Sequence, residues 1–524
     1  MRSAGTGLYH GTWWDLHKEE QSEQVMAGRY IRLLPEDSDP VDWDDLDRLA
    51  RKMTSAQEPT PTPETKVDPE EDREITAAYT YLGQFVDHDL TFDPTSRLRE
   101  SLGEKQLEAL ADFRTPRFDL DNLYGRGPDD QPYMYGQDGI HMLLGERMSG
   151  NPFDPDARQI PRGPNGRALI GDPRNDENRI VAQLHAIFLR FHNQVADYLA
   201  KPEHLGKDVS FEEVRNQVRW HYQWMLITDY LLMVVNNETY LSVFADRHGP
   251  TPRLPGSLNN LRLMPVEFSV AAFRFGHSMI RPQYRLNTTI ERRPIFLRDD
   301  DRTPADDAAD LGGFRPIPSD WAIDWQFFID LQPGARRAAT SRLYDPIARR
   351  PQRAYKIDTS LASPLRDLPA RIASDPSMLA RRNLERGATF KLPSGQAAAR
   401  ALGEKVIPDE DLVIGKATGK GEKTPLAEIA GSFVGRAPLW AYILSEAQVS
   451  SWDKADSGVY PDDIPIKLGP VGGRIVAGVF AALLRGDPTS YLNKGAPFTP
   501  ITDFTRDGAF GLAELINVAL GPTP

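Results

Sequence analysis

The chain of 524 residues contains no cysteine. This absence excludes disulfide bonds, zinc sites built from cysteine, and cysteine nucleophiles. Long apolar runs are missing too, because the longest, Ile475–Leu484, is far shorter than the roughly 20 residues that a membrane-spanning helix needs. We therefore expect no membrane span, and we interpret this run as a buried helix that follows Gly472 and Gly473.

Basic residues are fewer than acidic residues, and the formal net charge is −13. A general nucleic-acid binder needs a basic footprint, so the balance of charge argues against that class of function. The N-terminal residues Met1–Thr6 lack the apolar core of a signal peptide. A cytoplasmic location and export without a recognisable signal peptide both remain open, as does the oligomeric state.

The pattern along the chain indicates a mainly α protein, a single large helical body with few short strands. Residues 1–72 are interpreted as an N-terminal arm that ends in a proline-rich and acidic linker from residue 55, and residues 73–524 as the body. Trp13, Trp14 and Trp43 could anchor the arm. Apolar residues at three- and four-residue steps predict a helix over 178–201. Ser210 and Glu213 form a capping box that predicts a second helix from residue 211 to residue 235.

The most informative segment is a polar cluster, Gln84-Phe85-Val86-Asp87-His88-Asp89, within a helix expected over Thr76–Leu90. In a helix, positions four apart lie on one face, so Gln84 and His88 point the same way. Buried polar groups are costly unless they are bonded or used. Taken alone, the segment is ambiguous, and a satisfied core histidine is its commoner explanation.

Two further clusters change this interpretation. They are Phe273-Arg274-Phe275-Gly276-His277 and Asp172-Pro173-Arg174-Asn175-Asp176-Glu177. Together with the first cluster, they resemble motifs of the animal-type haem peroxidases, in a form similar to bacterial members, and the resemblance runs from about residue 75 to about residue 492. A Gln-x-x-Asp-His-Asp helix, an arginine and a glutamate three residues apart, a Phe-Arg-aromatic-Gly-His stretch and an Asn-x-x-Arg motif occur in the family's order.

The resemblance implies a haem b cofactor with His277 as the axial ligand of the iron. Asn383, in Asn383-Leu384-Glu385-Arg386, matches the residue that bonds the second nitrogen of that histidine and orients it. Arg274 and Arg386 match arginines that pair with the haem propionates, for which a guanidinium is well suited. Surface ion pairs are the alternative for both arginines.

On the opposite face of the haem, the resemblance implies catalytic roles for three residues. His88 would move the peroxide proton between the two oxygens, which suits a group with a pKa near neutrality. Arg174 would stabilise the charge that develops as the O–O bond breaks. Gln84 would hold the water or an incoming halide. Asp87 and Glu177 match carboxylates that form ester bonds to the haem, so the cofactor could be ester-linked; ordinary helix acids are the alternative.

A calcium site is the last implication. Oxygen donors alternate in Thr115-Pro116-Arg117-Phe118-Asp119-Leu120-Asp121, and calcium takes six to eight oxygens. The family match assigns Thr115, the Arg117 carbonyl, Asp119 and Asp121 as ligands, with Asp89 completing the shell. A solvated turn rich in aspartate is the alternative for the loop sequence alone.

We therefore expect a peroxidase that reduces hydrogen peroxide and oxidises halides, thiocyanate or small aromatic donors. One alternative is fatty-acid dioxygenation on the same scaffold. Those relatives carry a tyrosine three residues before the axial histidine, where this chain has Arg274. The other alternative is a haem-binding adhesion module without catalysis, against which His88, Arg174 and Gln84 argue.

Overall fold

The computed structural model describes residues 28–521, with short gaps and four longer ones at 57–67, 256–262, 298–308 and 332–350. Trp13 and Trp14 of the expected arm lie outside the described residues, whereas Trp43 begins helix α3 (Trp43–Lys52) and packs against the core. The expectation of a mainly α body is confirmed, because helices carry the architecture and every described sheet is small.

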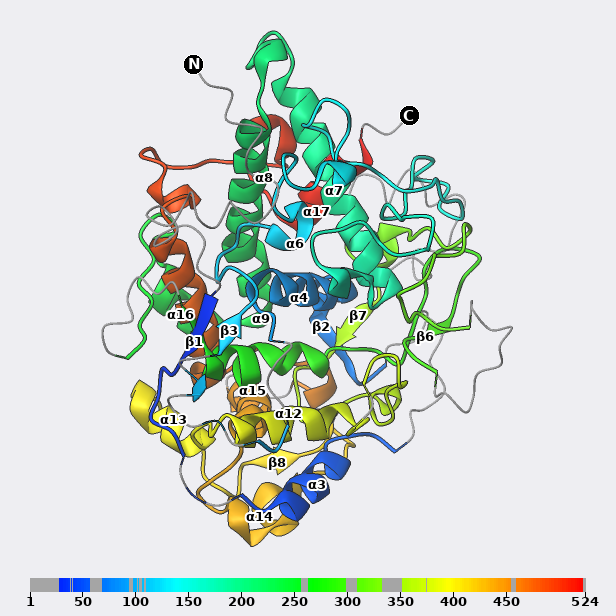
Figure 1. Ribbon diagram of the computed structural model, residues 1–524. Coiled ribbons are helices and arrows are strands. Elements are labelled where there is room, and N and C mark those ends of the chain that lie inside the picture. Colours follow the sequence, from blue (N-terminus) through cyan, green and yellow to red (C-terminus); the bar gives the residue numbers. More distant parts are fainter. Residues whose placement is uncertain are drawn as a thin grey trace.

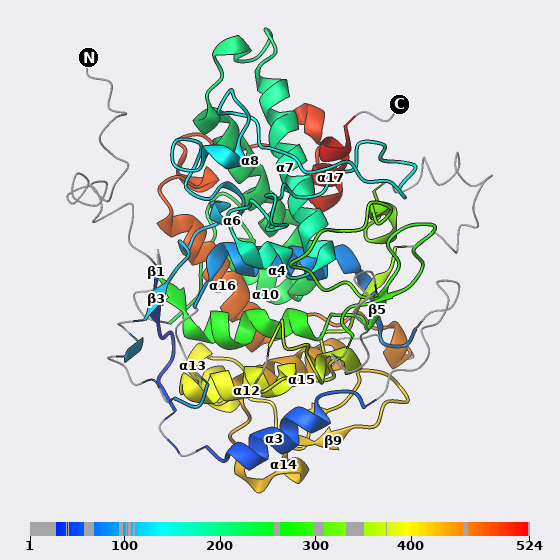
Figure 2. The ribbon, with the colours of Figure 1, turned by 45° about the vertical axis from the view of Figure 1, so that its right-hand side comes forward.

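The principal helices surround one continuous hydrophobic core. They are α4 (Ala77–Leu90), α7 (Arg179–Leu199), α8 (Phe211–Met225), α12 (Leu379–Thr389), α15 (Leu439–Asp453), α16 (Pro470–Gly486) and α17 (Leu512–Leu520). In Figures 1 and 2, α4 crosses the middle of the molecule, with α7 and α8 above it and α12 and α15 below. The N-terminal end of α8 carries the expected capping box of Ser210 and Glu213.

Two expected helices differ slightly at their ends. The helix expected over 178–201 is α7, and Asn178 caps it by accepting a hydrogen bond from the Ile180 amide. The helix expected over 211–235 changes at Leu226 into one π-helical turn, Leu226–Tyr230, and then ends as α9 (Leu231–Val234). Such turns are hard to anticipate, because they depend on packing more than on periodicity.

The apolar run Ile475–Leu484 lies within α16 and is buried throughout, as expected. Gly472 and Gly473 allow close packing at the start of this helix, since a Cβ at either glycine would meet side chains of Ile443 or Val235 within 3 Å. No helix in the described part of the chain is long and apolar enough to cross a bilayer.

Helix α4 is buried along most of its length. Eleven of its fourteen residues are buried, and the three that keep accessible surface are Gly83, Gln84 and Asp87. These positions share one face of the helix. The polar motif therefore contributes to a narrow strip of accessible surface on α4, formed by Gly83, Gln84 and Asp87, in the middle of the protein. We call it the accessible strip.

A three-stranded sheet joins distant parts of the chain. Strand β1 (Gly28–Ile31) lies between β3 (Ala111–Asp112) and β4 (Met264–Pro265), antiparallel to the first and parallel to the second. A second small sheet pairs β2 (Glu71–Thr76) with β7 (Arg353–Tyr355). The carboxyl groups of Glu71 and Asp72 are buried, so the chain already packs into the body before the residue-73 boundary expected between arm and body.

Candidate active site

His88 lies near the end of α4 and is 4 % exposed. Its Nδ1 is 2.8 Å from the side-chain oxygen of Asn175, which accepts the hydrogen bond and leaves Nε2 as the basic nitrogen. Nε2 is 3.5 Å from a carboxylate oxygen of Glu177, and the same oxygen accepts a hydrogen bond from the Gln84 amide. Burial would raise the pKa of Glu177, but its hydrogen bond to His88 and the charges of His88 and Arg174 hold that pKa below the usual value.

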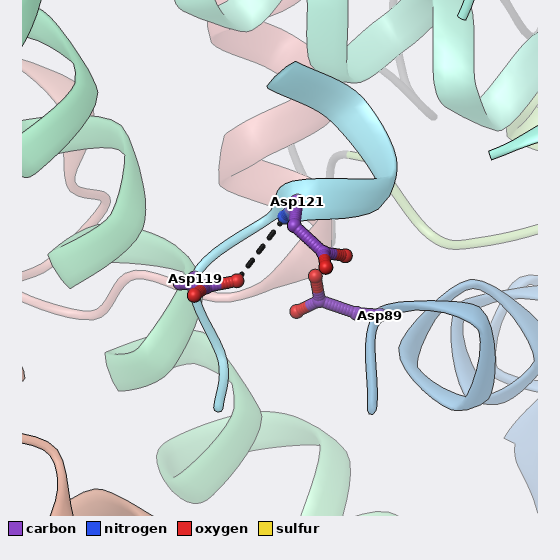
Figure 3. A group of neighbouring side chains, drawn as sticks. All are labelled: Asp89, Asp119 and Asp121. Carbon is purple, nitrogen blue, oxygen red and sulfur yellow. Dashed lines mark hydrogen bonds between the residues drawn. The ribbon is translucent and has the colours of Figure 1, made fainter. Parts of the chain in front are cut away.

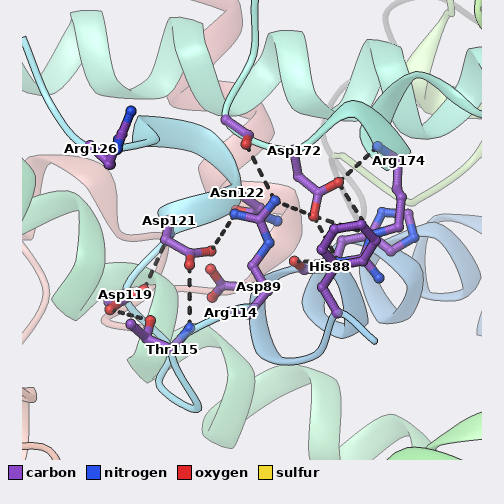
Figure 4. Close-up of polar contacts among 12 residues, drawn as sticks. His88, Asp89, Arg114, Thr115, Asp119, Asp121, Asn122, Arg126, Asp172 and Arg174 are labelled. Carbon is purple, nitrogen blue, oxygen red and sulfur yellow. Dashed lines mark hydrogen bonds and ion pairs between the residues drawn. The ribbon is translucent and has the colours of Figure 1, made fainter. Parts of the chain in front are cut away.

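Arg174 is held rigidly beside this group. Its guanidinium donates to both oxygens of Asp172, the shortest contact being 2.7 Å, and also to the His88 carbonyl at 3.1 Å. The guanidinium carbon lies 4.6 Å from the centre of the Phe92 ring. Figure 4 shows Arg114 on the other side of Asp172, where its Nη2 is 2.6 Å from the carboxylate. One fully buried carboxylate thus orients two arginines.

His277 lies at the end of an unusual segment, a π-helical turn over Glu267–Ala271 followed by a 3₁₀ segment over Ala272–His277. Its Nδ1 is 2.8 Å from the amide nitrogen of Asn383 on α12. Burial, and then the charge of Arg274, lower the pKa of His277 to about 3. The ring is therefore neutral, which is the state that binds a metal ion.

Arginines gather next to this histidine. Arg274 donates to the Ser269 carbonyl at 3.0 Å and to the Asn383 side chain at 3.3 Å. Burial, and then the nearby charge of Arg386, lower the pKa of Arg274 to about 10. Arg386 forms an ion pair with Asp93 at 3.5 Å, and the two side chains are 19 % and 9 % exposed. The partly buried guanidinium of Arg274 has no carboxylate partner among the described residues, so its charge suits an anionic ligand.

The accessible surface in this region suits a flat cofactor. Gly276 precedes His277, and a Cβ added there would meet no atom within 4 Å, so the space beside this histidine is open. Gly83, Gln84 and Asp87 supply accessible surface from α4. A neutral imidazole with an orienting amide, open space beside it and a pair of arginines fit a haem with its iron ligand and two propionates.

Three carboxylates meet at the end of α4. Ligand atoms of Asp89, Asp119 and Asp121 lie within 4.8 Å of one another, and Figure 3 shows the three groups turned toward a common point. Thr115 donates its hydroxyl to Asp119 at 2.7 Å, and the Arg117 amide donates to the Thr115 carbonyl in the same loop. Burial, and then Asp119 and Asp121, raise the pKa of Asp89 well above its usual value.

The carboxylate oxygens at this point are not saturated by hydrogen bonds. Asp89 Oδ1 and Asp121 Oδ1 have no hydrogen-bond partner among the described residues, and the nearest cation to the latter is Arg114 at 3.4 Å. Leu120, between the two loop acids, adopts a left-handed backbone with φ of 61°, which turns both side chains to one side. Such a set of buried, unpaired oxygens suits a hard divalent cation.

Residues 111–313 match the family model described as animal haem peroxidase. This region of the chain is therefore similar to the animal haem peroxidases. The match covers the 115–121 loop, Arg174, Glu177 and His277, while α4 and Asn383 lie outside it.

Curated relatives are similar over parts of their length. Thyroid peroxidase of Canis lupus familiaris is 31 % identical over 128 residues, which are 24 % of this chain and 13 % of that protein. Peroxidasin of Drosophila melanogaster is 23 % identical over 334 residues, 63 % of this chain and 19 % of that protein. This chain therefore spans less than a fifth of the length of either relative.

Solved structures share the fold of this chain. Peroxidase A of Dictyostelium discoideum superposes with a TM-score of 0.54 at 16 % identity, covering 94 % of this chain and 96 % of that one. A fatty acid alpha-dioxygenase of Arabidopsis thaliana superposes with a TM-score of 0.50 at 15 % identity, covering 92 % and 74 %. At these identities the likeness concerns the fold alone.

Sequence reasoning missed the residues that orient this site. Asp172 and Asn175 stood within a quoted cluster but received no role, and Arg114 was not singled out. His185 is bonded to Asn175 at 3.0 Å and so extends the network behind His88. The signal for Asp172 was local, because its side chain also accepts from the Arg174 amide as the N-cap of a 3₁₀ turn, Pro173–Asp176.

Proposed function

We propose that this protein is a haem peroxidase that reduces hydrogen peroxide and oxidises halides, thiocyanate or small aromatic donors. The observation that carries the proposal is the pairing of His88 with Arg174 beside the accessible strip of α4. A buried imidazole that can take up a proton on Nε2, and a fixed guanidinium, are the two groups that heterolysis of a peroxide needs. When bound, the haem supplies the redox chemistry that breaks the O–O bond.

Three residues would act on the peroxide and the donor. His88 Nε2 takes the proton from one peroxide oxygen and returns it to the other, while Asn175 keeps Nδ1 protonated. Arg174, which Asp172 holds in place, stabilises the negative charge on the departing oxygen. Gln84, the neighbour of His88 one helical turn earlier, holds the water or the incoming halide.

His277 would ligate the iron, and Asn383 would fix the plane of its ring. An amide partner carries no charge, so it makes the imidazole a weaker electron donor than a carboxylate partner would. Arg274 and Arg386 would pair with the two propionates. The depressed pKa of Arg274, caused by burial and by Arg386, supports this role, because an anion between the two arginines would relieve the repulsion.

Calcium would occupy the point where Asp89, Asp119 and Asp121 meet, with Thr115 and the Arg117 carbonyl as further ligands. Because Asp89 adjoins His88 in α4, the cation would hold the end of this helix and the general base with it. The repulsion among the three acids, which raises the pKa of Asp89 in addition to burial, would be relieved by the ion.

The most detailed part of the proposal is that Asp87 and Glu177 form ester bonds to the porphyrin. Both residues flank the accessible strip, one on α4 and one next to His88. Asn178 follows Glu177 in this chain and has no sulfur, so a sulfonium link cannot form at that position. We therefore expect at most two esters, and oxidation of bromide, iodide or thiocyanate in preference to chloride.

The test is haem binding followed by a donor screen. The purified protein should show one haem band, and His277→Ala should abolish it, whereas His204→Ala, on an exposed turn, should leave it unchanged. Peroxide turnover is then measured with bromide, iodide, thiocyanate and phenols. An unchanged haem spectrum in His277→Ala would remove this histidine from the proposal, and no turnover with any donor would remove the peroxidase function.

Fatty-acid dioxygenation remains the second candidate, because an alpha-dioxygenase of Arabidopsis thaliana has a related fold. Arg274, three residues before His277, argues against it because that position lacks the tyrosine expected of such an enzyme. Oxygen uptake with a long-chain fatty acid in the absence of peroxide distinguishes the two candidates.

A further inference from the structure

The N-terminal strand β1 lies between the two halves of the haem site. On one side it pairs with β3, whose Asp112 accepts a hydrogen bond from the Phe92 amide just beyond α4. On the other side it pairs with β4, which leads directly into the π-helical turn before His277. A side chain of β1 is thereby brought between the His88 side and the His277 side.

Tyr30 and Asp112 lie on the same face of this sheet. In the antiparallel pair Gly28 stands opposite Asp112, and Tyr30 is two residues further along the same strand, so its side chain points to the side of Asp112. Diagonal neighbours of this kind are within reach of an aromatic ring. Gly28 has no side chain to separate them, and a Cβ there would come within 3.0 Å of the Asp112 Cβ.

Both residues are buried, and Asp112 has an unsatisfied carboxylate oxygen. Tyr30 is 3 % exposed. Asp112 is fully buried, its Oδ1 accepts from the Phe92 and Arg114 amides, and its Oδ2 has no partner among the described residues. Buried polar groups without partners are rare and point to a use.

The charges around Tyr30 belong to both sides of the site. Burial, and then Asp112, Asp93 and Asp87, raise the pKa of the phenol, while Arg174 lowers it. On the other side, Tyr30 is among the groups that act on the pKa of Arg274. Charged groups from both sides of the proposed haem site therefore act on this phenol.

We propose that Tyr30 is a redox-active residue, an internal one-electron donor to the haem, and that Asp112 accepts its proton. The inference rests on the proposed peroxidase function. Hydrogen peroxide takes up two electrons and two protons in total and becomes two molecules of water, and the bound haem would pass on the electrons. The phenol of Tyr30 would supply one of these electrons: its O–H bond breaks, the proton moves to Asp112, and a neutral phenoxyl radical remains. An external donor then restores the phenol with one electron and one proton.

The state of Asp112 suits this role. Burial raises its pKa to about 7, although the Phe92 and Arg114 amides and then Arg174 act in the opposite direction. A carboxylate with this pKa is a stronger proton acceptor than an ordinary aspartate; about half of it is deprotonated at neutral pH, and most of it is deprotonated at more alkaline pH. An oxidised phenol is a strong acid, so an adjacent acceptor makes the loss of its electron easier.

Tyr230 is the rival donor. A Cβ added at Gly83 of α4 would lie 2.6 Å from the Tyr230 hydroxyl, and the Tyr230 ring packs edge-to-face against Phe273. This phenol is also close to the accessible strip. The one carboxylate that raises its pKa, in addition to burial, is Asp87, which the proposal above assigns to an ester. An esterified Asp87 could not take a proton, so Tyr230 serves as the matched control.

The experiment follows the radical directly. Haem-loaded protein containing ring-deuterated tyrosine is mixed with hydrogen peroxide, frozen, and examined by electron paramagnetic resonance beside unlabelled protein. The parent should give an organic radical whose hyperfine pattern narrows on deuteration. Tyr30→Phe should lose that signal, Tyr230→Phe should keep it, and Asp112→Asn, which retains the Oδ1 acceptor, should form it more slowly.

Haem content and peroxide consumption, measured on the same samples, separate this inference from the function on which it rests. Haem-loaded Tyr30→Phe that consumes peroxide and still gives the full tyrosyl signal would overturn the assignment, and so would loss of the signal in Tyr230→Phe alone. A parent that consumes peroxide without any tyrosyl radical would do the same. A parent that neither binds haem nor consumes peroxide would reject the peroxidase function and this inference with it.

Discussion

Asp172→Asn tests the arrangement that holds Arg174, the arginine for which we propose a catalytic role. The carboxylate of Asp172 is fully buried and receives hydrogen bonds from Arg174, while Arg114 contacts it from the opposite side at 2.6 Å. An asparagine has nearly the same shape, so the substitution removes charge and little volume. Two partly buried guanidinium groups would then share one neutral amide oxygen.

The magnitude follows from the pKa of the carboxyl group. Burial would raise this pKa, but Arg174, His88 and Arg114 lower it from 3.8 to about 2. At about 1.36 kcal/mol for each pKa unit, the ionised form contributes roughly 2.5 kcal/mol to the free energy of unfolding. The folded pKa lies below the unfolded one, so this contribution is present above pH 4 and is lost as the pH falls toward 2. Uncompensated buried cations raise the expected loss in the variant to about 3–5 kcal/mol at neutral pH.

Urea denaturation at pH 7 measures this loss, and the rate of reaction with peroxide measures the effect on Arg174. The matched control is Asp156→Asn, whose ion pair with Arg147 joins two side chains that are each more than 60 % exposed. Exposed pairs contribute little, so this control should retain parent stability and rate. Equal effects in the two variants would refute the reasoning that Asp172 stabilises the fold and orients Arg174.

Three further expectations concern the site. Arg174→Leu should slow the reaction with peroxide by about 10²–10³-fold and leave later donor oxidation much less affected, as rapid-mixing kinetics can show; an unaltered peroxide step would make this arginine structural. Asp119→Asn should lower calcium content, haem occupancy and Tm together, and elemental analysis that finds no calcium in active parent protein would remove the site. After peroxide treatment, acid–organic extraction should leave haem on the parent protein, while the Asp87→Ala, Glu177→Ala double variant should release it. Complete release from the treated parent would make both residues ordinary carboxylates.

Much of the fold and the composition of the site could be predicted from the sequence, because both depend on local pattern. The helix that carries Gln84 and His88 follows from apolar spacing, and the capping box of Ser210 and Glu213 identifies the start of α8. The tertiary partners of these residues could not be predicted. Arg114 contacts Asp172, from which it is separated by 58 positions in the sequence. The π-helical turn before His277 depends on packing, which the spacing of apolar residues does not predict.

The place of β1 was equally invisible, since an isolated run of four residues near the N-terminus carries no strong strand signal. Its neighbours in the sheet come from positions 111–112 and 264–265, and only the folded chain brings them together. Glu267 was not noticed either, although its buried carboxylate accepts hydrogen bonds from the Leu33 and Leu34 amides. Such contacts are determined by the whole topology.

The central position of β1 has a consequence for how the protein is assembled. Strands β3 and β4 touch β1 and are not paired with each other, so the sheet exists only once residues 28–31 have docked. Pairing across such long stretches of chain pays a large closure entropy and therefore forms late in folding. We expect the haem to enter while this strand is still undocked, and to be retained afterwards by the rarity with which the strand detaches. The N-terminal segment would then determine how long the haem stays bound. In a variant whose chain begins at residue 35, the cofactor should dissociate faster, and this effect should be larger than the loss of equilibrium affinity.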